Sequence, residues 1–79
     1  MTDYLATFHT HLAALKTHRT LSAAGIQARM AAVPRKISSS CGTWVFYRAE
    51  EPGMELLDGD TEAVYRLTDG GAELLRKFE

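Results

Sequence analysis

The chain has 79 residues, of which 46% are hydrophobic and 24% charged, which is typical of one globular domain and too short for two independent cores. The formal net charge of −1 argues against a general nucleic-acid binder, which usually carries a basic excess. Residues 1–5 show no basic leader before an apolar run, and no stretch approaches the apolar length that spans a bilayer. We therefore expect a single domain over residues 1–79, in the cytoplasm, with neither nucleic acid nor membrane as a partner.

The first half of the chain predicts a strand, a helix and a second strand. Residues Tyr4 to Phe8 alternate apolar and small polar side chains, which favours a short strand. Thr10 is a candidate N-cap and Gly25 a candidate C-terminal stop for a helix with an apolar stripe. That stripe consists of Leu12, Ala13, Ala14, Leu15, Leu21 and Ala24. Residues 26–32 alternate with period two and predict a strand that ends before Pro34.

The second half predicts two more strands and two helical segments. Residues 34–42 contain turn formers without periodicity and are expected to form a loop. Residues 43–47 are entirely β-branched or aromatic and predict a strong strand. A short helix is expected at residues 54–57, a strand at 62–67 and a terminal helix at 72–78.

This order of elements predicts an α+β fold. It matches a ferredoxin-like split β-α-β sandwich, in which helices cover one face of a four-stranded antiparallel sheet. The other face would be partly open, and four aromatic residues are expected to contribute apolar surface there: Trp44, Phe46, Tyr47 and Tyr65. An uncovered aromatic patch favours self-association, so a homodimer is a possible assembly.

Cys41 is the residue best suited to carry chemistry. It is the single cysteine, so it forms no internal disulfide and fits a reducing compartment. A thiol becomes a useful nucleophile when backbone amides or basic side chains stabilise its thiolate. The neighbours expected to bind substrate are Arg35, Lys36, Ser39, Ser40 and Gly42. The alternative is that Cys41 packs inward as a small hydrophobic residue.

The segment Val33-Pro34-Arg35-Lys36-Ile37-Ser38-Ser39-Ser40-Cys41-Gly42 resembles the signature of a family of small bacterial proteins described as "putative selenium/sulfur (Se/S) carrier protein-like". The similarity covers about residues 4–47 and includes Phe8, Ala14-Leu15-Lys16 and Ala24-Gly25-Ile26. After residue 47 the sequence differs from the family pattern, because Pro52 and Gly53 interrupt the helix that the family is expected to have there. The resemblance implies that Cys41 holds sulfur or selenium as a persulfide or selenopersulfide and passes it to an acceptor thiol.

A protein of this kind would be a relay and not a complete enzyme, and no cofactor is expected. Its partners would be a donor of sulfur or selenium, such as a cysteine desulfurase, and an acceptor protein. The alternative function is an interaction or regulatory module whose open sheet face binds a partner or a second copy, with Cys41 structural. The two functions differ in the exposure of the Cys41 sulfur, because a carrier requires a sulfur that solvent can reach and an interaction module tolerates a buried one.

Two other patterns bear on binding. The histidines at positions 9, 11 and 18 fit no standard zinc spacing, so no metal site is predicted. The basic residues Arg19, Arg29, Arg35 and Lys36 are most simply a solvated surface. They would attract a small anion if the region of Arg35 closed over the Cys41 amides.

Overall fold

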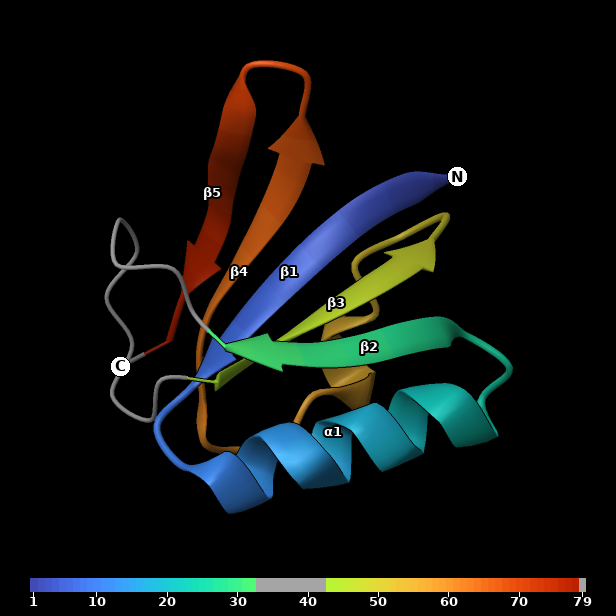
Figure 1. Cartoon of the computed structure of the whole chain (residues 1–79), viewed down its shortest axis with the longest axis vertical. Helices are drawn as coiled ribbons and strands as arrows, with labels where there is room; N and C mark the ends of the chain where they lie inside the picture. Colours follow the sequence, from blue (N-terminus) through green and yellow to red (C-terminus); the bar gives the residue numbers. More distant parts are fainter. Residues whose placement is uncertain (33–42, 79) are drawn as a thin grey trace.

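The structure, a computed structural model, describes residues 1–32 and 43–78 (Figure 1). In chain order its elements are β1 (Thr2–Phe8), α1 (His11–Ala23), β2 (Gln27–Ala32), β3 (Thr43–Ala49), the 3-10 turn η1 (Met54–Leu56), β4 (Thr61–Thr68) and β5 (Gly71–Lys77). The strands form one sheet in the order β2-β3-β1-β4-β5, with every neighbouring pair antiparallel. The described residues therefore form an α+β fold: one α-helix on a five-stranded antiparallel sheet.

Strand β1 lies at the centre of the sheet because its side chains are buried on both faces. Residues 4–8 are all buried, and the strand pairs with β3 on one side and β4 on the other. The helix joins β1 to β2, and β3 lies between these two strands. The β-α-β unit is therefore split, as predicted.

Helix α1 begins and ends where its sequence predicts. Thr10 is the N-cap, and its Oγ1 accepts a hydrogen bond from the Ala13 amide at 3.1 Å. At the other end Gly25 has a φ of 80°, and the Ile26 amide donates to the Leu21 carbonyl at 2.9 Å. This is a Schellman cap, which needs a left-handed residue after the helix. No helix within the described ranges is long and apolar enough to cross a membrane.

The buried face of α1 differs in part from the predicted apolar stripe. Leu12 is 57% exposed and Ala24 is also exposed, whereas Thr17 is 1% exposed. The buried positions are Ala13, Ala14, Thr17 and Leu21. Thr17 fits this face because its Oγ1 accepts a hydrogen bond from the Asp58 amide at 3.0 Å, so its hydroxyl is not left unpaired.

The core lies between α1 and the sheet. On the helix side, two alanines let the helix backbone approach the strands closely. The buried cluster consists of Tyr4, Ala6, Phe8, Ala13, Ala14, Leu21, Val45, Tyr47, Ala49 and Val64. Alternate residues of β1 and β3 supply most of it, as period two requires of a strand that presents one face to a helix.

One prediction for the second half is confirmed in shortened form and one is wrong. The short helix expected at residues 54–57 is the single 3-10 turn η1, which follows Gly53 in a left-handed conformation with φ of 60°. The predicted terminal helix at 72–78 is the strand β5, which pairs with β4. Its residues favour a helix by propensity, but the short turn after Thr68 returns the chain to β4, and tertiary pairing overrides propensity. The sheet therefore has a fifth strand in place of a second helix.

The predicted open aromatic face is only partly correct. Tyr47 lies on the helix side, 3% exposed, because neighbours on a strand point to opposite faces. Its hydroxyl donates to the Pro52 carbonyl at 2.6 Å, and its ring stacks on Tyr4 at 5.3 Å. On the helix-free face Trp44 is buried, while Phe46 and Tyr65 are half-buried.

Candidate functional site

The predicted reactive segment joins two strands that are neighbours in the sheet. Cys41 and its predicted partners Arg35, Lys36, Ser39, Ser40 and Gly42 lie outside the described residues. The segment leaves the sheet at Ala32 and returns at Thr43, and these two residues are register partners. Cys41 precedes Thr43 by two residues, so chain geometry keeps their Cα atoms within about 7 Å. The described residues at this end of the sheet are the ones nearest to Cys41 along the chain.

The N-terminus of α1 lies at the same end of the sheet. His11, the first residue of the helix, has its Nδ1 3.2 Å from the Thr43 Oγ1. Thr10 caps the helix and turns the chain from β1 into it. The amide ends of a helix attract negative charge, and an imidazole can donate a proton or a hydrogen bond. This end of the molecule is thus suited to stabilise an anion.

Trp44 follows Thr43 on β3, and its side chain is a buried hydrogen-bond donor on the opposite, helix-free face of the sheet. The residue is 6% exposed, and its Nε1 has no acceptor among the described residues. Its ring meets Phe46 edge to face at 4.9 Å. A buried indole N–H without a partner costs free energy, so a group that accepts from it is stabilised at this position.

A second polar group lies beside Trp44 in the sheet. Thr7 is the register partner of Trp44, and its Oγ1 donates to the Glu62 Oε1 at 3.3 Å. The Glu62 Oε2 lies 3.7 Å from His9 Nδ1, and the Glu62 side chain is 19% exposed. Sequence reasoning missed Thr7 and Glu62, because only the strand register brings residues 55 positions apart together.

The histidines do not form a shared site. His11 contacts Thr43, whereas His18 donates from Nε2 to the Ala28 carbonyl at 3.2 Å. Within residues 1–32 and 43–78, no three His, Asp, Glu or Cys side chains group closely enough to hold a metal ion.

Of the four basic residues that could attract an anion, only two are in the described part of the chain. Arg35 and Lys36 lie outside it, while Arg19 is exposed on α1. Arg29 lies on the opposite, helix-free face, with its guanidinium 5.1 Å from the centre of the Phe46 ring. The sheet therefore separates Arg19 from Arg29, and these two do not form one anion site.

Comparison with known proteins agrees with the resemblance found in the sequence. Residues 3–57 match the family described as "Putative Se/S carrier protein-like". This range also includes the residues around Pro52, where the sequence differs from the expected family pattern. The "Uncharacterized protein YtiA" of Escherichia coli (strain K12) is 32% identical over 73 residues, which covers 89% of this chain and 85% of the relative. No solved structure matches the chain. The chain belongs to the family described as "Putative Se/S carrier protein-like".

Proposed function

We propose that the protein carries sulfur or selenium on Cys41 as a persulfide or selenopersulfide. The observation that carries this proposal is the family match over residues 3–57, a range that contains Cys41, the single cysteine of the chain. The Cys41 thiolate attacks the outer sulfur of a donor persulfide. The donor S–S bond breaks, a new S–S bond forms on Cys41, and the donor leaves as a thiolate. An acceptor thiolate then repeats the exchange on the loaded Cys41, with no net oxidation.

The surroundings of Thr43 support a reactive thiolate two residues away. His11 and the amide end of α1, which lie on the helix side next to Thr43, favour negative charge. In this proposal Arg35 and Lys36 supply positive charge, Ser39 and Ser40 hydrogen bonds, and Gly42 close backbone approach. The rate of exchange depends on the thiolate fraction and on access, so these groups raise the rate of loading.

The carrier acts between two other proteins. A single thiol can accept one atom and release it to another thiol. The chain has no second cysteine that could attack the persulfide and form a disulfide. We propose a cysteine desulfurase or a comparable selenium enzyme as the donor and a thiol-bearing protein as the acceptor. The cytoplasm, which keeps thiols reduced, is the matching compartment.

Intact-mass analysis tests the proposal. The full chain is incubated with a cysteine desulfurase and cysteine, and we expect a gain of about 32 Da, one sulfur atom on one thiol. The variant Cys41→Ser should gain nothing. Thr20→Val, a substitution of an exposed helix threonine, serves as the control and should load as the wild type does. A wild-type chain that gains no sulfur from an active desulfurase contradicts the carrier function.

A surface on β5 favours the second candidate, an interaction module. Every residue of this strand is exposed, and Leu74 and Leu75 are 51% and 37% exposed. An edge strand with apolar side chains can pair with another chain. We propose this edge as the contact with a second copy, and sedimentation equilibrium of wild type and Leu74→Lys tests it. A dimer that dissociates in the variant supports the contact, and a monomeric wild type contradicts it.

A further inference from the structure

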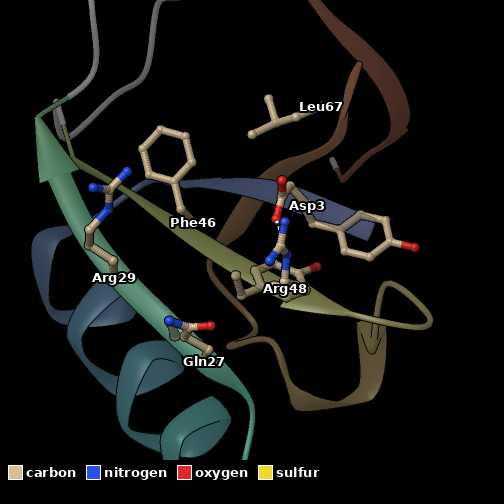
Figure 2. A pocket seen from close by; sticks show the side chains of 9 residues that line it. Asp3, Gln27, Arg29, Phe46, Arg48 and Leu67 are labelled. Atoms are coloured by element: carbon tan, nitrogen blue, oxygen red, sulfur yellow. Dashed lines mark hydrogen bonds and ion pairs between the residues drawn. The ribbon is translucent and has the colours of Figure 1, made fainter. Parts of the chain in front are cut away.

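A hollow of about 620 Å³ lies on the helix-free face of the sheet (Figure 2). The side chains that shape it are Asp3, Gln27, Arg29, Phe46, Arg48 and Leu67. They meet there because β2 and β3 pair Gln27 with Arg48 and Arg29 with Phe46, so both pairs face the same side. Its volume lies within the range of small-molecule sites.

The charge of the hollow is positive. Arg48 donates from Nε to the Asp3 Oδ1 at 2.9 Å, which engages one edge of its guanidinium. Arg29 lies over the Phe46 ring and pairs with no carboxylate among the described residues. Among the described residues, two cations and one anion therefore line the hollow. The two arginines are diagonal neighbours on adjacent strands, so their long side chains can both reach a ligand group placed between them.

The same hollow has an apolar wall. Phe46 is half-buried, and Trp44 holds it edge to face at 4.9 Å. The neighbour of Phe46 on β1 is the fully buried Leu5. Leu67 lies opposite, on β4, and is also half-buried (Figure 2). Basic groups on the rim beside an aromatic ring suit a ligand with a charged head and an apolar body.

We propose that this hollow binds a small organic anion. Arg29 and the outer nitrogens of Arg48 hold a carboxylate or phosphate head, and an aromatic or aliphatic body packs against Phe46 and Leu67. Guanidinium groups bind both kinds of head through paired N–H donors. Asp3 weakens the attraction of Arg48 for the ligand, because its carboxylate at the Nε edge offsets the guanidinium charge and repels an anionic head group. The groups that hold the ligand in this proposal are all described residues and do not include Cys41.

An NMR titration of the isotope-labelled full chain tests the proposal with benzoate and phenyl phosphate as probes. We expect at least one probe to give saturable shifts of the Phe46 and Arg48 amides, with a dissociation constant on the order of 1 mM, usual for a ligand of this size. The tighter probe identifies the head group. Benzyl alcohol, which lacks the charge, and acetate, which lacks the ring, should both bind at least about tenfold more weakly.

Variants with opposite expected effects make the test specific. Arg29→Gln should weaken the probe about tenfold, whereas Asp3→Asn should tighten it by removing the repelling carboxylate. Arg76→Gln is the matched control, because Arg76 is also an exposed arginine over an aromatic ring, 4.8 Å from the centre of Phe78. No saturable shift with either probe overturns the proposal. Equal weakening by Arg29→Gln and Arg76→Gln, or benzyl alcohol binding as tightly as the anions, overturns it as well.

Discussion

Tyr47 shows how a single residue joins the core to its polar surroundings. Its ring is buried against Tyr4, and its hydroxyl satisfies the Pro52 carbonyl in the turn that follows β3. Burial, and after it the proximity of Tyr4 and Glu55, raises the pKa of Tyr47 above its ordinary value. The neutral phenol is therefore the form that the folded state requires.

The variant Tyr47→Phe should change both stability and its dependence on pH. At neutral pH we expect it to cost about 1 kcal/mol of unfolding free energy, because the Pro52 carbonyl loses its donor. Since the pKa of Tyr47 is higher in the folded state, the wild type keeps this contribution below about pH 10 and loses it as the unfolded phenol ionises above that pH. The difference between the two proteins should therefore narrow above about pH 10.

Urea unfolding of both proteins across the alkaline range measures this difference in unfolding free energy. Groups that titrate equally in both proteins make no contribution to the difference. Tyr65→Phe, at a half-buried tyrosine on the opposite face, is the control. A gap between wild type and Tyr47→Phe that stays constant with pH would contradict the role of the buried phenol.

At the scale of elements, local signals succeed where the local chain sets the conformation. Thr10 and Gly25 predicted the ends of α1 because a cap depends on a few adjacent residues. The leucine, glutamate and basic residues of the terminal segment favour a helix by propensity. The segment forms a strand because it pairs with β4, and the sequence of β5 alone does not predict this pairing.

The Schellman cap of α1 gives a prediction at this scale. Gly25→Ala should cost about 1 kcal/mol of unfolding free energy, because alanine is strained at a φ of 80°. An added Cβ at this position meets no atom within 4 Å, so the cost is conformational and not steric. Gly59→Ala is the matched control, since its Cβ site is equally open and its φ is not left-handed. Chemical denaturation should show little change there, and equal losses in both variants would contradict the explanation.

At the scale of the whole molecule, the sheet register brings together residues that are far apart in the sequence. The family signature around Cys41 was recognisable because its residues are contiguous. The contact of His11 with Thr43 joins residues 32 positions apart, and that of Thr7 with Glu62 joins residues 55 apart. Neither contact follows from a motif, because the first requires β3 to lie beside β1, which leads into α1, and the second requires β4 to lie beside β1. The contiguous segment around Cys41 predicted the thiol, whereas only the topology brings these pairs of described residues together.

The carrier function and the structural alternative for Cys41 differ in what the thiol contributes to stability. A sulfur that exchanges with other proteins must reach solvent, so Cys41→Ser should change the unfolding free energy by less than about 0.5 kcal/mol. A cysteine packed in the core would cost more, because serine places an unpaired hydroxyl in an apolar site. Leu21→Ala, at a fully buried position, calibrates the assay with an expected loss of about 2–5 kcal/mol.

Native-state labelling of the same samples with a thiol reagent completes the test, because an exposed, activated thiolate reacts rapidly and a buried thiol slowly. Rapid labelling together with an unchanged stability of Cys41→Ser agrees with a thiol that is presented for transfer. Slow labelling together with a loss comparable to that of Leu21→Ala assigns Cys41 to the core. The carrier function would then have no accessible sulfur on which to act, since exchange requires the attacking thiolate to reach its partner.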